Sequence, residues 1–188
     1  QSPPAGRLPL VILPARMLWD KGVGEFVECA MRVNKKGVKA RFALVGDPDP
    51  HNPETISVGQ LRTWNDQGIV EWWEYRKNMP NVYQQASIVC LPSYREGLPK
   101  SLLEAASCSL PIVTFDVPGC REVVIDGVNG ILAPFKDKNA LYRALETILT
   151  DTKLAEKLGK AGREIVLKNF SQEKVATETI QVWKDVLA

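Results

Sequence analysis

Short, uninterrupted apolar runs alternate with amphipathic stretches along most of the chain. The runs at residues 10–13, 41–45, 69–73, 88–91, 112–115 and 131–133 are predicted strands. Between the first two, apolar residues recur at helical spacing, at Val23, Phe26, Val27, Ala30 and Met31. The remaining helices are predicted over about 55–66, 80–86, 100–108, 119–125, 141–148, 154–168 and 172–187. The last of these begins after Ser171, a plausible N-cap.

The predicted strands do not alternate apolar and polar residues, as strands of a sheet with one solvent-exposed face do. Continuous apolar strands are typical of parallel sheets, whose two faces are both covered by helices. The alternation of strand and helix therefore predicts an α/β fold, a Rossmann-like open parallel sheet of about six strands with helices on both faces. Ligands of open parallel sheets bind beyond the carboxyl ends of the strands, so the loops after the strands are the places to search for chemistry.

Composition removes several classes of protein. The 188 residues are 45% hydrophobic and 24% charged, which excludes a disordered, collagen-like or coiled-coil chain. The 24 Lys and Arg balance 22 Asp and Glu, so the formal charge of +2 gives no general attraction to nucleic acid. The apolar runs are far shorter than the ~20 residues that span a bilayer, and no signal peptide is recognisable.

Cysteine and histidine offer little for catalysis or metal binding. Cys29, Cys90, Cys108 and Cys120 form no Cys-x-x-Cys pair, which favours free thiols in a reducing cytosol over a disulfide framework or a zinc site. The single histidine, His51, lies in a Pro-rich loop. A catalytic site built around an imidazole is therefore not expected.

The loop after the first strand carries two cations, Arg16 and Lys21, beside the start of a helix. An ammonium and a guanidinium near a helix N-terminus suit a diphosphate, and Gly22 lets the backbone approach whatever binds. A solvated loop with no ligand is the alternative. The glycine spacing of residues 21–24 fits neither a dinucleotide fingerprint nor a P-loop.

Two carboxylates follow the fourth strand with seven residues between them. Gly97 and Pro99 keep Glu96 out of the next helix, whereas Glu104 lies more than one turn inside it. The amides of the first turn, around residues 100–102, are predicted to point at the ligand crevice. One carboxylate can then reach one end of an elongated ligand, and the other carboxylate a different part.

The Asp47-Pro48-Asp49 sequence after the second strand looks like an Asp-x-Asp metal site. In such a site carboxylates share a divalent cation with a diphosphate. Because Arg16 and Lys21 already supply positive charge for that group, a Pro-interrupted turn is the favoured interpretation. No metal site is predicted.

Tryptophan could suggest a sugar platform or a membrane-interface belt. Trp72 and Trp73 are adjacent at the end of the third predicted strand, and Trp183 lies in the last predicted helix. Because buried indoles are a common part of protein cores, we assign all three to core packing.

Three motifs in order resemble glycosyltransferase family 4. They are Arg16…Lys21-Gly22, Glu96-Gly97…Glu104-Ala105 and Pro118-Gly119…Glu122…Asp126-Gly127…Asn129-Gly130. The resemblance implies a retaining enzyme of the GT-B fold, of which this chain is the C-terminal half. Residues 1–9 would then be a linker from an N-terminal half, 10–170 the nucleotide-sugar-binding domain, and 171–188 a C-terminal helix.

The resemblance also implies roles for individual residues. Arg16 and Lys21 would hold the donor diphosphate and assist its departure, and Glu96 would face the donor sugar as the third catalytic residue. Glu104 would bind the ribose hydroxyls. The remaining donor contacts would come from the loop and helix start at Gly97, Leu98, Ser101 and Leu102, the last two through backbone amides near the phosphates.

One position departs from the family pattern. The family often has glycine in the loop after the third strand, where the backbone meets the nucleobase, but this chain reads Trp73-Glu74-Tyr75-Arg76. Tyr75 is kept as a candidate base contact.

The resulting expectation is a donor-binding domain of a retaining glycosyltransferase that uses a nucleotide-diphosphate sugar, most simply a UDP-sugar, without a metal or other cofactor. Its acceptor would be a glycan or polyprenyl-linked sugar in polysaccharide or cell-envelope synthesis, bound through the N-terminal half. The full enzyme would be cytoplasmic, with peripheral association at the inner face of the membrane, and would not bind nucleic acid. The alternatives are a non-catalytic nucleotide-sugar-binding module and a GT-B-fold sugar-nucleotide epimerase.

Overall fold

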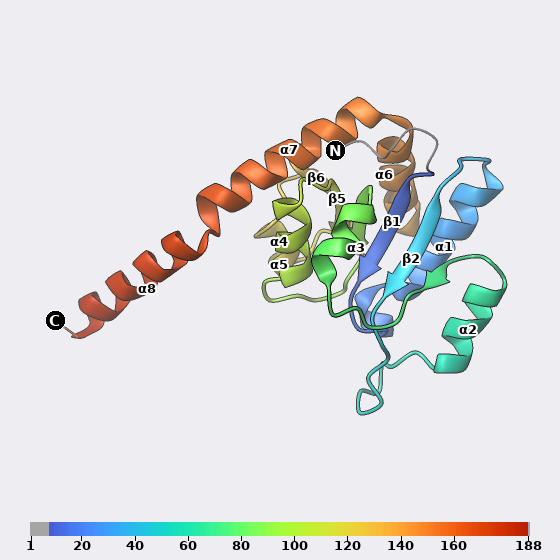
Figure 1. Cartoon of the computed structure of the whole chain (residues 1–188), viewed down its shortest axis with the longest axis horizontal. Coiled ribbons are helices and arrows are strands. Elements are labelled where there is room, and N and C mark those ends of the chain that lie inside the picture. Colours follow the sequence, from blue (N-terminus) through green and yellow to red (C-terminus); the bar gives the residue numbers. More distant parts are fainter. Residues whose placement is uncertain (1–7, 188) are drawn as a thin grey trace.

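A computed structural model describes residues 8–187 of the chain (Figure 1). Its centre is a six-stranded, all-parallel sheet in the order β3-β2-β1-β4-β5-β6. The strands are β1 (Leu10–Pro14), β2 (Arg41–Val45), β3 (Glu71–Trp72), β4 (Ile88–Leu91), β5 (Ile112–Phe115) and β6 (Gly130–Ala133). The predicted Rossmann-like α/β architecture is confirmed.

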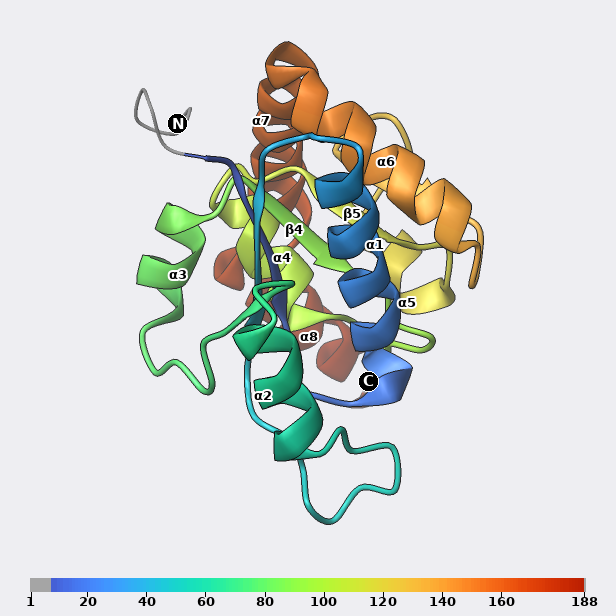
Figure 2. The ribbon, with the colours of Figure 1, turned by 90° about the vertical axis from the view of Figure 1, so that its right-hand side faces the viewer.

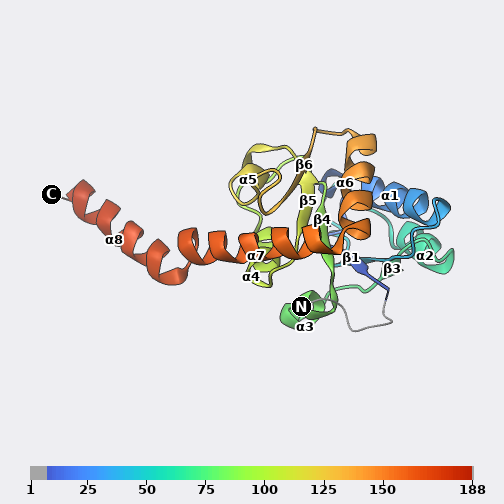
Figure 3. The ribbon, with the colours of Figure 1, turned by 90° about the horizontal axis from the view of Figure 1, so that it is seen from above.

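Helices cover both faces of this sheet. They are α1 (Val23–Lys35), α2 (Val58–Asp66), α3 (Met79–Gln85), α4 (Lys100–Ser107), α5 (Pro118–Arg121), α6 (Lys138–Thr150), α7 (Thr152–Asn169) and α8 (Gln172–Leu187), with a 3-10 turn η1 (Trp19–Lys21) before α1. In Figure 3, α1, α2 and α6 lie on one side of the sheet, and α3 and α4 lie on the other. Figure 2 shows α7 running past α6 and behind the sheet. The four inner strands are buried along almost their whole length, as the continuous apolar runs predict.

Two predicted elements are shorter than their apolar patterns. The third strand has two residues instead of five, because the amide of Ile69 still donates to Trp64 at the end of α2 and Glu74 turns the chain with a φ of 55°. The helix predicted over 119–125 ends at Arg121. Beyond it, the buried Asn129 side chain accepts from the amide of Ile125 and donates to a carbonyl, which holds the chain in a non-helical turn.

Helix α8 extends away from the body of the protein, as Figures 1 and 3 show. It begins as predicted, with the Ser171 hydroxyl 3.3 Å from the Lys174 amide, but it buries none of its residues. The assignment of Trp183 to the core is therefore wrong, since this side chain is 67% exposed, whereas Trp72 and Trp73 do pack against the core. Most of the predicted 1–9 linker lies outside the described residues.

The sheet reverses its direction of growth between β1 and β4. These strands are neighbours in space although β2 and β3 come between them in sequence, so their following loops meet at one edge. Gly22 makes that meeting possible, because a Cβ at this position would lie 2.0 Å from the carbonyl oxygen of Pro92. The sequence suggested that Gly22 lets the backbone approach a ligand, but in the structure Gly22 lets it approach the loop after β4. Within residues 8–187, no helix combines the length and the apolar character needed to cross a membrane.

Candidate functional site

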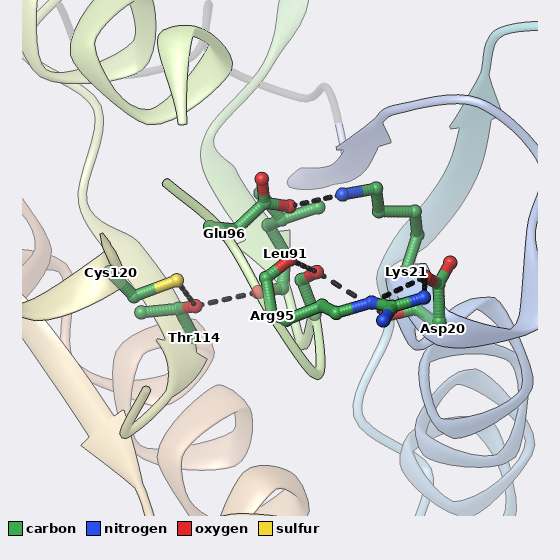
Figure 4. A network of polar contacts seen from close by, with 8 residues as sticks. Asp20, Lys21, Leu91, Arg95, Glu96, Thr114 and Cys120 are labelled. Atoms are coloured by element: carbon green, nitrogen blue, oxygen red, sulfur yellow. Dashed lines mark hydrogen bonds and ion pairs between the residues drawn. The ribbon is translucent and has the colours of Figure 1, made fainter. Parts of the chain in front are cut away.

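Lys21 and Glu96 face each other from the loops that follow β1 and β4 (Figure 4). Lys21 ends η1 and Glu96 lies in the loop after β4, yet Lys21 Nζ donates to Glu96 Oε1 over 2.7 Å. Their side chains are only 17% and 14% exposed, so this ion pair is shielded far more than a surface salt bridge. Sequence reasoning assigned the two residues to different parts of the ligand, and the structure brings them into direct contact.

The backbone that carries Glu96 is braced from two sides. The carbonyl oxygen of Asp20 accepts from the Tyr94 amide over 2.8 Å and from the buried Ser93 hydroxyl over 3.3 Å. On the other side, a Cβ on Gly119 would come within 2.3 Å of the carbonyl oxygens of Glu96 and Gly97. Glycine at the start of α5 therefore lets this helix pack directly on the loop.

Beneath the loop, Thr114 and Cys120 tie β4, β5 and α5 together. The buried Thr114 hydroxyl donates to the Leu91 carbonyl oxygen over 2.6 Å and lies 3.1 Å from Cys120 Sγ (Figure 4). Burial raises the pKa of Cys120 to about 11, so this thiol is protonated at neutral pH and acts as packing.

Glu104 is held by a residue that sequence reasoning missed. The Tyr83 hydroxyl, from α3, lies 2.9 Å from Glu104 Oε2 and 3.2 Å from the carbonyl oxygen of Ser101. Burial, reinforced by the negative charge of Glu104, raises the pKa of Tyr83, which keeps the phenol a donor. No pattern in the sequence distinguishes this tyrosine from an ordinary core residue of a short helix.

The start of α4 presents backbone amides to the same region. Its N-cap, Pro99, supplies no side-chain acceptor, and in the described part of the chain the amides of Lys100 and Ser101 donate to no protein group. The amide of Leu102 was also predicted to meet a phosphate, but it donates to the Pro99 carbonyl oxygen over 3.0 Å. Free first-turn amides at a helix N-terminus can bind an anion.

Two loop residues predicted to contact the donor are open to solvent. Gly97 is exposed, and the Leu98 side chain is 51% exposed although it is apolar. Both lie between Glu96 and the start of α4. They are therefore accessible to a ligand that reaches from Glu96 to the α4 amides.

Arg16 and Tyr75 belong to a different cluster, beyond β2. Arg16 Nη1 lies 2.6 Å from Asp49 Oδ2, and the Tyr75 amide donates to Asp47 Oδ1 over 3.0 Å. The head groups of Arg16 and Lys21 contact acids on different loops. Both carboxylates of the Asp47-Pro48-Asp49 turn thus have protein partners.

The loop after β3 turns sharply at Glu74. Glu74 has a φ of 55°, in the left-handed region, and its carbonyl oxygen accepts from the Gly46 amide over 2.9 Å. The exposed Tyr75 side chain lines a pocket of about 490 Å³ against α3. The other residues around this pocket are Trp73, Arg76, Lys77, Asn78, Asn81, Val82 and Gln85.

Comparison with known proteins identifies the family of this chain. The family described as Glycosyl transferases group 1 matches residues 1–165. The chain belongs to this family. A relative from Campylobacter jejuni, N,N'-diacetylbacillosaminyl-diphospho-undecaprenol alpha-1,3-N-acetylgalactosaminyltransferase, is 34% identical over 95% of this chain and 45% of its own length.

Solved structures of other proteins superpose closely on this group 1 glycosyltransferase domain. Sucrose-phosphate synthase from Thermosynechococcus elongatus matches with a TM-score of 0.85 and 28% identity, over 98% of this chain and 46% of its own. Anabaena HepE in complex with UDP and glucose matches with a TM-score of 0.83 over 94% of this chain and 48% of its own, and at 19% identity it supports the fold alone. The chain spans about half the length of the relatives that it matches.

Proposed function

We propose that this chain is the donor-binding domain of a retaining glycosyltransferase, similar to family 4, that uses a UDP-sugar. The observation that carries the proposal is the shielded Lys21–Glu96 pair at the point where the sheet reverses direction, next to free amides of α4. A cation, a carboxylate and helix amides on neighbouring loops match the phosphates and hydroxyls of a nucleotide sugar. UDP is chosen because HepE binds it on the same fold.

In the proposed complex the donor replaces the contact between Lys21 and Glu96. The diphosphate takes Lys21 and the amides of Lys100 and Ser101, and a hydroxyl of the sugar takes Glu96. Glu104, oriented by the Tyr83 hydroxyl, accepts from the ribose. These contacts span a ligand from nucleoside to sugar.

Transfer would proceed by departure of UDP from the anomeric carbon as the acceptor hydroxyl attacks from the same face. The proton of that hydroxyl passes to the leaving phosphate oxygen, so neither Glu96 nor Glu104 has to become a covalent nucleophile. Lys21 stabilises the negative charge that grows on the diphosphate, which is the largest electrostatic change in the step. We propose that no metal is needed for this role.

The acceptor would be a glycan or a lipid-linked sugar, held by the other half of the full-length enzyme. The C. jejuni relative is named for transfer to an undecaprenyl diphosphate-linked sugar, which supports a polyprenyl-linked acceptor in polysaccharide or cell-envelope synthesis. A cytoplasmic enzyme associated with the membrane surface would meet both substrates. The relatives reported above are named as a transferase and a synthase, which favours transfer over a binding module or an epimerase.

Titration calorimetry of the 188-residue chain tests the proposal. UDP, UDP-N-acetylgalactosamine, UDP-glucose and GDP are titrated with and without EDTA, and UDP compounds are expected to bind in both conditions. Lys21→Ala should weaken UDP at least tenfold, whereas Lys160→Ala, which removes an exposed cation from α7, should not. Binding that disappears in EDTA, or that Lys21→Ala leaves unchanged, would contradict the assignment.

A further inference from the structure

Tyr94 joins the loop after β4 to segments that follow or end three other strands. Its amide donates to the carbonyl oxygen of Asp20 over 2.8 Å, and its hydroxyl donates to Glu25 Oε1 in α1 over 2.7 Å. Its ring centroid lies 6.4 Å from that of Phe115 at the end of β5 and 5.6 Å from that of Phe135 after β6. From the loop after β4, Tyr94 therefore contacts the segments at the carboxyl ends of β1, β5 and β6.

The contact with Glu25 fixes the far end of the Tyr94 side chain. Glu25 is 7% exposed, and within residues 8–187 its carboxylate receives a side-chain hydrogen bond from the Tyr94 hydroxyl alone. A buried carboxylate strongly disfavours loss of its donor, so the hydroxyl is held in place. Lys136 Nζ, 4.3 Å from the ring centroid, packs on the aromatic face. The ring can therefore neither rotate nor withdraw freely.

Tyr94 is linked to both residues of the ion pair through their neighbours in the chain. Tyr94 precedes Glu96 by two positions, and its amide partner, Asp20, directly precedes Lys21. We propose that Tyr94, held by Glu25, is a positioning residue that keeps Glu96 opposite Lys21. It would touch no substrate itself and would act by setting the separation of the two loops.

A measurement without any ligand tests this role directly. Unfolding equilibrium constants are determined for the wild type, Lys21→Met, Glu96→Gln and the double variant, and the same cycle is repeated with Tyr94→Phe. The coupling factor is the ratio between the double effect and the product of the single effects. We expect it to fall at least threefold in the Tyr94→Phe background, since the ring remains but its anchor to Glu25 is lost. An unchanged coupling factor would overturn the proposal.

Tyr142 provides a matched control. Its hydroxyl donates to Glu146 Oε1 within α6, and the Arg32 guanidinium lies 4.5 Å from its ring centroid, so it has the same kinds of contact at a distance from the loops. Tyr142→Phe should leave the Lys21–Glu96 coupling factor within a factor of about 2 of the wild type, a tolerance set by the usual scatter of additivity. If it lowers the coupling as much as Tyr94→Phe does, the effect is a general loss of stability and the positioning role is wrong.

A second readout rests on the proposed function and uses UDP and UDP-N-acetylgalactosamine. Tyr94→Phe should lower the ratio of UDP-N-acetylgalactosamine affinity to UDP affinity about threefold or more. In a chain that already carries Glu96→Gln, adding Tyr94→Phe should not lower this ratio further. Glu25→Gln, which keeps an acceptor for the Tyr94 hydroxyl, should restore most of the preference that Glu25→Leu loses. Equal losses in both Glu25 variants would contradict the positioning role. A chain that binds neither compound would remove the proposed function, while the ligand-free coupling would still decide the role of Tyr94.

Discussion

Lys21 Nζ lies 2.7 Å from Glu96 Oε1, although the two residues are 75 positions apart in the sequence. A ligand phosphate that binds the ammonium therefore competes with the carboxylate, and a ligand hydroxyl that binds the carboxylate competes with the ammonium. In the proposed complex a sugar nucleotide offers a phosphate to Lys21 and a hydroxyl of the transferred sugar to Glu96. UDP lacks that sugar, and its ribose is assigned to Glu104, so UDP offers no partner to Glu96.

Glu96→Gln should accordingly strengthen UDP binding and weaken the preference for a UDP-sugar. Removing the negative charge frees Lys21 for the diphosphate, and we expect UDP affinity to rise about three- to tenfold, which corresponds to roughly 0.7–1.4 kcal/mol. The sugar nucleotide gains less, because it also loses its carboxylate acceptor. Calorimetric titration of both compounds checks the ratio, and a fall in UDP affinity would contradict this account of the pair.

Lys21 and Arg16 should differ in their effect on UDP, although the sequence gives them the same role. Lys21→Ala removes a shielded charge-assisted contact and should cost about 1.5–3 kcal/mol, or roughly ten- to a hundredfold in affinity. Arg16 is 58% exposed and paired with Asp49, so Arg16→Ala should cost threefold or less by the usual weakness of exposed pairs.

Uridine is the control ligand for these two variants, since it lacks the diphosphate. Neither substitution should change its affinity. If Asp49 holds Arg16 away from the phosphates, Asp49→Asn should also raise UDP affinity, and the gain should vanish when Arg16 is replaced by Ala. Equal losses of UDP in Lys21→Ala and Arg16→Ala would show that Arg16 leaves Asp49 to bind the diphosphate.

The parts of this fold that were predictable depend on local periodicity. Continuous apolar strands and amphipathic helices are recognised from residues close together in the sequence. The six strands and the parallel character of the sheet could therefore be predicted. The third strand was overextended because Ile69 is apolar but completes the end of α2 through its bond to Trp64. Trp183 was misplaced because the amphipathic pattern of a helix does not say whether anything covers its apolar face.

The candidate site was predictable in position and less so in its contacts. The loops after β1 and β4 could be named because open parallel sheets place ligands there. The direct pairing of Lys21 with Glu96 depends on the strand order, which local patterns do not contain. The sequence did not mark Glu25 or Tyr83 as part of the site. Acidic residues are common in the first turn of a helix, and a tyrosine among apolar neighbours is common in a protein core. Their roles come from tertiary packing alone.

Glu104 and Tyr83 should act together on the nucleoside side of the ligand. Glu104→Gln should weaken uridine, UDP and a UDP-sugar by similar factors, since all three carry the ribose. Tyr83→Phe removes the donor that orients Glu104 and should produce a smaller loss, about two- to fivefold, for one neutral-to-charged hydrogen bond acting indirectly. The pair should be non-additive, with Tyr83→Phe adding little once Glu104 is Gln. Independent, additive losses would place Tyr83 in contact with the ligand.

Tyr83 also makes stability sensitive to alkaline pH. Its pKa is raised by burial and by the charge of Glu104, whereas the unfolded phenol titrates near its ordinary value of about 10. A raised folded pKa contributes stability that is fully present below pH ~10 and is lost as the pH rises beyond it. The free energy of unfolding should therefore fall more steeply above pH 10 in the wild type than in Tyr83→Phe. Tyr75→Phe, at a 70% exposed position, should follow the wild-type slope.

Glu74 offers a test of whether glycine suits the loop after β3 better than a residue with a Cβ. Its φ of 55° is costly for a residue with a Cβ, by about 1–2 kcal/mol, and glycine adopts it freely at an entropic cost of roughly 0.5–1 kcal/mol. Glu74→Gly should thus stabilise the chain by about 0.5–1 kcal/mol, which is a rise of roughly 1–4 °C in Tm for a domain of this size. Glu74→Ala removes the same carboxylate but keeps the Cβ, so it should give no such gain. Thermal denaturation followed by circular dichroism measures both variants. Equal gains from alanine and glycine would mean that the charge of Glu74, and not its backbone conformation, is the destabilising feature.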